Sequence, residues 1–147
     1  MTRIAIAGAA GRMGRRIAAL AAADDSFEIV SATESAGHEA LGSDLGPLCG
    51  AGELGVTVTE EMAGDPEAII DFTTPESTLR WLDAARERKI AHVIGTTGLT
   101  ESHLAEIAEA AERIPVVQAP NMSVGVNLLF GIVGEVAAAL GDDYDIE

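Results

Sequence analysis

Three regularly spaced glycines are the residues of this chain with the clearest chemical use. Gly8, Gly11 and Gly14 follow the apolar run of residues 4–7 and precede the amphipathic run of residues 15–23. They therefore stand where a strand turns into a helix, and the first N–H groups of a helix lack internal partners and attract anions. The pattern indicates a pyrophosphate-binding loop, in which Gly8 makes the turn, Gly11 admits the pyrophosphate and Gly14 allows close packing on the sheet.

An acidic residue stands at the distance expected for the same kind of site. Glu34 follows the second strand-like run, residues 28–33, twenty residues after Gly14. In dinucleotide-binding folds an acid at this place accepts hydrogen bonds from the hydroxyls of the adenosine ribose. Glycine-rich turns also arise where α/β units simply pack, and a solvated carboxylate can end any strand. The register of strand, glycines, helix and acid favours nucleotide binding over these alternatives.

Small and polar residues also follow the later strand-like runs. Residues 95–98, Gly-Thr-Thr-Gly, offer a backbone without bulk and hydroxyls for the nicotinamide half of a cofactor, although the same run alone is an ordinary turn. Asp71 closes an apolar run, so we expect it to bond neighbouring backbone amides and assign it no catalysis. His38, His92 and His103 show no ligand spacing, and we predict no metal site.

The order of apolar and helical runs predicts the elements that position these residues. We expect strands at residues 3–7, 28–33, 56–59, 68–72, 92–94 and 116–119, and helices at 12–23, 75–88 and 101–113. This alternation predicts a doubly wound α/β fold with a parallel sheet. Residues 35–55 contain six glycines and Pro47, too many breakers for a regular element. We expect a long loop there, which either folds over the adenosine half of a cofactor or forms a disordered surface excursion.

Composition limits the classes of function. The 147 residues, 48% hydrophobic and 3% aromatic, can form one aliphatic core. A formal net charge of −15 argues against nucleic-acid binding. No apolar run is long enough to span a membrane and no leader precedes the first strand, so we expect a soluble, cytoplasmic protein. Lys89 is the only lysine, and the excess of acidic residues suggests the hypothesis of a halophilic source.

Together these motifs resemble the amino-terminal part of the dihydrodipicolinate reductases, enzymes of the diaminopimelate route to lysine. The matching segments run in order along the chain: 8–14 (Gly-x-x-Gly-Arg-Met-Gly), Glu34, 42–44 (Gly-Ser-Asp), 71–75 (Asp-Phe-Thr-x-Pro), 95–98 (Gly-Thr-Thr-Gly) and 121–127 (Asn-Phe-Ser-x-Gly-Val-Asn). The resemblance implies an NAD(P)H-dependent reduction of 4-hydroxy-tetrahydrodipicolinate, a small cyclic dicarboxylate, with this chain as the cofactor-binding half. It implies contacts to NAD or NADP from Gly8, Ala9, Ala10, Gly11, Arg12, Met13, Glu34, Gly95, Thr96, Thr97, Ala119, Pro120, Asn121 and Met122.

The sequence departs from the family pattern in three ways. Ser35 stands where many members carry an arginine that can pair with a 2′-phosphate, which weakens the case for strict NADP preference, although Arg12 can still serve a phosphate. Met122 replaces the usual phenylalanine and keeps an apolar wall. The His-His-x-x-x-Lys and Ser-Gly-Thr motifs of the family's substrate domain do not occur. We therefore assign no catalytic residue and expect this chain to bind cofactor without turnover.

The resemblance also implies a division of the chain. We expect a dinucleotide-binding domain at residues 1–125, and a linker helix with the start of a truncated substrate domain at residues 126–147. The apolar stripe of that helix should lack part of its cover. The full-length protein is expected to form a homotetramer. The alternative function is a stand-alone NAD(H)-binding sensor, in which cofactor binding shifts a partner-binding surface without any reaction.

Overall fold

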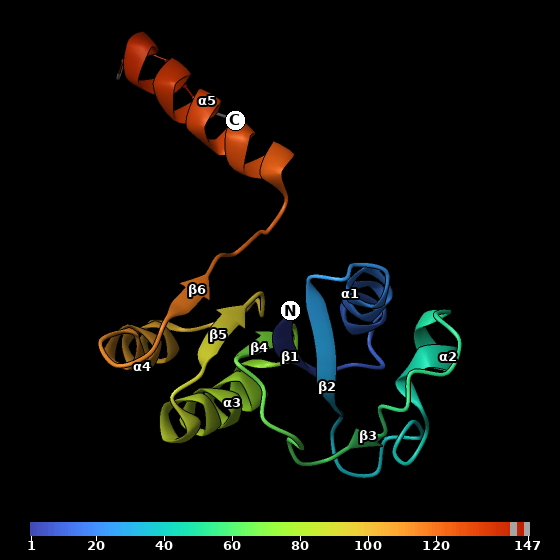
Figure 1. Ribbon diagram of the computed structural model, residues 1–147. Coiled ribbons are helices and arrows are strands. Elements are labelled where there is room, and N and C mark those ends of the chain that lie inside the picture. Colours follow the sequence, from blue (N-terminus) through green and yellow to red (C-terminus); the bar gives the residue numbers. More distant parts are fainter. Residues whose placement is uncertain (142–143, 146–147) are drawn as a thin grey trace.

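The fold is a parallel sheet flanked by helices, as Figure 1 shows. The computed structural model describes residues 1–141 and 144–145. The strands are β1 (Thr2–Ala7), β2 (Phe27–Thr33), β3 (Val58–Thr59), β4 (Ala68–Asp71), β5 (Ala91–Ile94) and β6 (Val116–Gln118). The helices are α1 (Arg12–Ala22), α2 (Leu45–Cys49), α3 (Pro75–Arg88), α4 (Glu101–Ala111) and α5 (Val124–Leu140). The sheet order β3-β2-β1-β4-β5-β6, with every pairing parallel, confirms the predicted doubly wound α/β fold.

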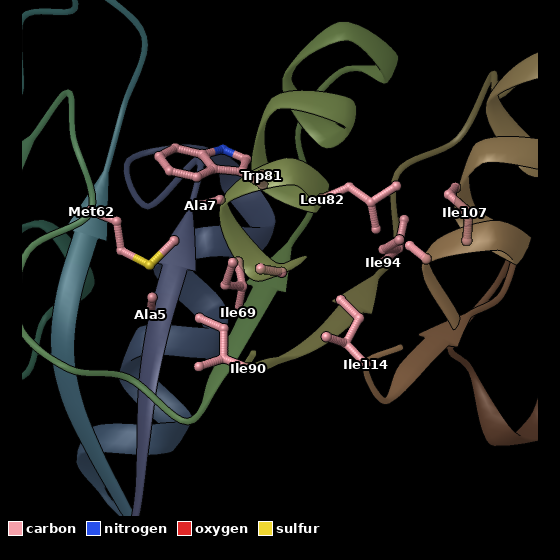
Figure 2. Packing of buried hydrophobic residues seen from close by; sticks show 12 residues of the cluster. Ala5, Ala7, Met62, Ile69, Trp81, Leu82, Ile90, Ile94, Ile107 and Ile114 are labelled. Atoms are coloured by element: carbon pink, nitrogen blue, oxygen red, sulfur yellow. The ribbon is translucent and has the colours of Figure 1, made fainter. Parts of the chain in front are cut away.

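Side chains alternate along β1 between two separate cores. Ile4 and Ile6 belong to one cluster, which α1 and α2 complete, whereas Ala5 and Ala7 belong to the other, which α3 and α4 complete. Figure 2 shows the second core, where the Trp81 ring of α3 lies over the small side chains of β1. The sheet is thus covered on both faces, as the aliphatic composition predicts.

Residues 35–55 correct one prediction. This segment contains a short helix, α2, and Ala40 and Leu45 are buried in the core beside α1, so the segment is neither a loop without regular structure nor a disordered excursion. The helix forms despite the glycines because the Asp44 side chain caps it by accepting the N–H of Gly46. A Cβ on Gly46 would collide with the backbone of Gly52, so this glycine allows the segment to fold back on itself.

The last helix, α5, extends away from the sheet (Figure 1). None of its residues is buried, and its apolar side chains are exposed, including those of Leu129, Val133 and Val136. This agrees with the expectation that its apolar stripe lacks cover. The predicted division at residue 125 stays a prediction, and residues 142–143 and 146–147 of its second part lie outside the described residues. No helix in the described part has the length and apolar character to cross a membrane.

Candidate functional site

The sheet order places a crevice above β1 and β4. The connections from β1 lead first to β2 and β3 on one side, and the chain then returns to β4 on the other side of β1. Because the strands are parallel, their carboxyl ends meet at one edge of the sheet, and ligands of such folds bind where the strand order reverses. The glycine loop follows β1 at this edge, and residues 72–74 follow β4.

The three glycines of the loop have different roles. Gly8 has a φ of +69°, and its N–H and that of Ala9 both donate to the carbonyl of Thr33, each at 3.0 Å. A Cβ on Gly14 would lie 2.1 Å from the Gly8 carbonyl oxygen, so helix α1 approaches the strand end through this residue. A Cβ on Gly11 would lie 3.1 Å from the same oxygen and meet no other atom within 4 Å. Gly8 therefore turns the chain, Gly14 packs the helix, and Gly11 keeps the loop open to a ligand.

The amino terminus of α1 carries free backbone donors. Gly11 is its N-cap residue and offers no side chain to cap the helix. Within the described residues, the N–H groups of Arg12, Met13 and Gly14 have no hydrogen-bond acceptor. Three unpaired N–H groups and the positive end of the helix dipole at a bare loop form an anion site of the kind that holds a pyrophosphate.

Glu34 is fixed beside this loop. Its Oε1 atom accepts the N–H of Ala10 at 2.8 Å and its Oε2 atom accepts the N–H of Ser35 at 3.2 Å. The backbone therefore orients the carboxylate, and each oxygen keeps a lone pair for a further donor such as a ribose hydroxyl. The position predicted from the twenty-residue spacing thus brings the acid into contact with the glycine loop.

A cavity of about 290 Å³, which we call the Glu34 cavity, lies between the ends of β2 and β4. Gly8, Glu34 and Ser35 form one wall, and the loop after β4 with the first turns of α3 forms the other. Its lining residues are Gly8, Thr33, Glu34, Ser35, Phe72, Thr73, Thr74, Ser77, Arg80 and Trp81. From residues 35–55 only Ser35 lines this cavity, so the segment does not cover it as one of the sequence alternatives proposed.

A second cavity of about 450 Å³, the Met122 cavity, lies on the other side of Phe72. It is lined by Met13, Phe72, Gly95, Pro120, Asn121, Met122 and Ser123. Phe72 lines both cavities, and its ring occupies the space that a Cβ on Gly95 would need, with the nearest ring atom 2.1 Å from that position. The two cavities therefore lie on either side of one aromatic ring next to the glycine loop.

A buried polar network lies beneath this edge of the sheet. The Asp71 carboxylate accepts the N–H and the hydroxyl of Thr73 at 3.0 and 2.6 Å and the hydroxyl of Thr96 at 3.3 Å, and it lies 3.2 Å from His92 Nε2. Asp71 thus bonds a neighbouring backbone amide, as predicted. The Thr96 hydroxyl also accepts from the N–H of Thr73 and the hydroxyl of Thr78. Because this hydroxyl is buried and saturated, Thr96 can reach a cofactor only through its backbone.

The structure brings part of the predicted set into the two cavities. Gly8, Met13, Glu34, Gly95, Pro120, Asn121 and Met122 line one or the other. The other predicted residues line neither: Ala9, Ala10, Gly11, Arg12, Thr96, Thr97 and Ala119. Ala9 and Ala10 are buried, so only their backbone is available to a ligand.

Phe72 and Arg80 are lining residues that the sequence reading did not assign. The expectation that strand ends share one edge points to Phe72, since it directly follows β4. Arg80 lies farther into α3, in its second turn, and no strand-end motif marks it. Glu76, in the first turn of α3, has a pKa below its ordinary value of 4.5, chiefly because its own backbone N–H bonds the carboxylate and also because of the Thr74 hydroxyl. This edge of the sheet is therefore acidic, and Arg80 is the cation among the residues of the Glu34 cavity.

Comparison with known proteins gives one consistent family. A family model described as "Dihydrodipicolinate reductase, N-terminus" matches residues 2–122. The chain is 46% identical over 147 residues to the 4-hydroxy-tetrahydrodipicolinate reductase of Rubrobacter xylanophilus and 47% identical over 150 residues to that of Geobacter metallireducens. These alignments cover 100% of this chain but 55% and 56% of the relatives, so the chain spans about half the length of the curated relatives it matches.

A solved structure shares the fold. The dipicolinate-bound dihydrodipicolinate reductase from Paenisporosarcina sp. TG-14 superposes with a TM-score of 0.72 at 24% sequence identity. The match covers 94% of this chain and 54% of that one. At this identity the likeness supports the fold alone, and it agrees with the sheet described above.

Proposed function

Because this chain belongs to the dihydrodipicolinate reductase family through its match to the amino-terminal family model, we propose that it binds the nicotinamide cofactor of such an enzyme. The cofactor is NADH or NADPH. The reaction we propose for the whole protein is the reduction of 4-hydroxy-tetrahydrodipicolinate to tetrahydrodipicolinate in lysine and diaminopimelate biosynthesis. The substrate, a small cyclic dicarboxylate, would be held by residues beyond the half of the relatives that this chain spans.

One observation carries the proposal: the three free N–H groups at the start of α1 lie where the strand order reverses, beside Glu34. We propose that residues 8–13 bind the pyrophosphate through their backbone and that Arg12 adds a positive charge. Glu34 accepts the hydroxyls of the adenosine ribose in the Glu34 cavity. This arrangement fits a dinucleotide because the acid and the anion site are joined by the Ala10 N–H bond.

The Met122 cavity suits the nicotinamide end. We propose that Gly95, the backbone of Thr96, Thr97 and residues 119–122 surround the ring, with Met122 as an apolar wall. When bound, the cofactor supplies the hydride, and the chain's own residues hold and orient the ring. Phe72 separates this cavity from the Glu34 cavity and limits where a bound dinucleotide can lie.

The relatives named above are reductases, which supports the enzymatic role rather than the stand-alone sensor. We further propose a cytoplasmic location, a homotetrameric full-length enzyme, and no binding to nucleic acid or membrane. The uncovered apolar side chains of α5 and the net charge of −15 support the assembly and the lack of nucleic-acid binding, respectively. The acidic composition supports the further proposal of adaptation to high salt.

Calorimetric titration with NADH tests the cofactor proposal. We expect saturable binding by the 147-residue chain and a loss of about tenfold or more in affinity for Gly11→Ala, because the added methyl group narrows the approach to the free N–H groups. Gly131→Ala is the control, since a Cβ there meets nothing within 4 Å. Absence of saturable binding to the wild-type chain would refute the proposal. Steady NADH oxidation on adding substrate would refute the expectation that this chain alone does not turn over.

A further inference from the structure

The two walls of the Glu34 cavity carry opposite charges. Glu34 lies at the end of β2, and Arg80 reaches the cavity from α3. The Nη2 atom of Arg80 donates to the carbonyl of Glu60 at 2.6 Å, and its guanidinium carbon lies 4.5 Å from the centroid of the Trp81 ring. Since Glu60 follows β3, the strand that pairs with β2, Arg80 spans from α3 to the side of the sheet that carries Glu34.

Arg80 is held in place but keeps most of its donors. Among the described residues it makes no ion pair within 4.0 Å, whereas Arg3 and Arg86 each contact two carboxylates. One hydrogen bond and the stacking on Trp81 orient the guanidinium, and its remaining N–H groups are unused. Glu34 and Arg80 thus line one cavity without pairing with each other, so a ligand group can lie between them.

We propose that Arg80 is the residue that binds the 2′-phosphate of NADP and so sets how well this chain accepts NADPH beside NADH. The inference rests on the proposed cofactor function. NADP differs from NAD by a phosphate on the adenosine ribose, the part of the cofactor assigned to Glu34, whose carboxylate repels that phosphate. The next residue, Ser35, is neutral, and the guanidinium across the cavity offers the charge and the planar pair of donors that bind phosphate oxygens.

A different contact with the cofactor is also chemically reasonable. A guanidinium stacked on an indole presents its second face to an adenine ring, and such stacking would stabilise NADH and NADPH equally. The two roles differ in one measurable quantity, the ratio of the affinities for the two cofactors. Binding of the 2′-phosphate changes this ratio, whereas adenine stacking leaves it constant.

The chain provides a matched control in Arg88. This residue lies on the same helix and also donates to carbonyls of the segment after β3, those of Gly64 and Met62, but it does not line the cavity. The experiment compares the dissociation constants of NADH and NADPH, measured by calorimetry, for the wild-type chain, Arg80→Gln, Arg80→Lys and Arg88→Gln. Thermal melting of each variant verifies that it is folded.

We expect Arg80→Gln to weaken NADPH binding by about tenfold or more while NADH binding changes by less than about twofold. Arg80→Lys keeps the charge and should retain most of the NADPH affinity, and Arg88→Gln should change neither. Equal losses for both cofactors, no loss for NADPH, or binding of NADH without NADPH by the wild-type chain would each overturn the role of Arg80 and leave the cofactor proposal intact. Failure of the wild-type chain to bind either cofactor would overturn both.

Discussion

At the scale of single residues, the site depends on groups that the fold leaves unused. The helix α1 starts without a capping side chain, and its first N–H groups would normally be satisfied by a Ser, Thr or Asp at the position of Gly11. Thr74 and Thr100 fulfil that role for α3 and α4 by accepting N–H groups of their helices. The contrast indicates that the bare start of α1 serves a ligand rather than the stability of the helix.

Asp71 gives the first residue-scale prediction. Replacement by Ala removes the acceptor of the Thr73 and Thr96 hydroxyls and the partner of His92, all in or beside the core. His92 Nδ1 already lacks a partner among the described residues, so the network has no spare acceptor for the ring. We expect Asp71→Ala to lower the free energy of unfolding by about 3 kcal/mol in urea denaturation.

Asp65→Ala is the matched control for this loss. The Asp65 side chain is 87% exposed and pairs with Arg3 at the surface, so its removal should cost less than about 1 kcal/mol. Equal effects of the two substitutions would show that the buried network contributes nothing particular to stability. The same network fixes Thr73 and Thr96 at the ligand edge, so Asp71 links the core to the site.

The sequence predicted the residues of the site whose spacing follows from strand geometry. Gly8 and Glu34 stand directly after strands, and parallel strands bring their carboxyl ends together whatever the loops do. Arg80 was not predicted because its place in the cavity depends on the packing angle of α3 and on a hydrogen bond to Glu60, which no local pattern encodes. Thr96 was predicted for its hydroxyl, yet the burial of that hydroxyl follows from contacts with Asp71 and Thr78 that are distant in sequence.

At the scale of elements, strong periodicity predicted well and breakers predicted poorly. The helix expected at residues 75–88 has those bounds in the structure, because Thr74 caps it and Pro75 fits its first turn. The segment 35–55 was expected to lack regular structure from its glycine content. Its order comes instead from the Asp44 carboxylate, which accepts the N–H groups of Gly46 and Leu54 at 2.8 and 2.9 Å.

This contact predicts a pH dependence of stability. The pKa of Asp44 lies below its ordinary value of 3.8, first because the Leu54 N–H donates to it and then because other backbone amides do, against a smaller effect of burial. A pKa lowered by folding stabilises the native state above the ordinary value, and this stabilisation is lost as the pH falls below 3.8 through the native value. We expect Asp44→Asn to flatten the decline of the melting temperature below about pH 4.

Asp25→Asn is the control for this pH profile, since the Asp25 carboxylate makes no hydrogen bond or ion pair within the described part of the chain. The two variants should differ below pH 4 and agree near pH 7. A steep acid decline that persists in Asp44→Asn would mean that other carboxylates, such as Asp24 with its lowered pKa, dominate the acid limb.

At the scale of the whole molecule, charge and cover are both unbalanced. The chain has 24 acidic and 9 basic residues, and the ion pairs of the described part involve mainly Arg3 and Arg86. Most carboxylates therefore have no cationic partner and repel one another across a small domain. The helix α5 adds an uncovered apolar surface, which high salt would make less favourable in water.

Self-repulsion predicts that salt stabilises this protein. At molar ionic strength the screening length falls to about 3 Å, so repulsion between surface carboxylates nearly vanishes in the folded state, where they are closest. We expect the melting temperature to be several degrees higher in about 2 M KCl than in dilute buffer. The triple variant Glu53→Lys, Glu106→Lys and Glu112→Lys exchanges three exposed negative charges for positive ones and should gain less from the same salt. An unchanged melting temperature in KCl would reject adaptation to high salt, and an equal gain in the triple variant would assign the effect to apolar burial rather than to charge.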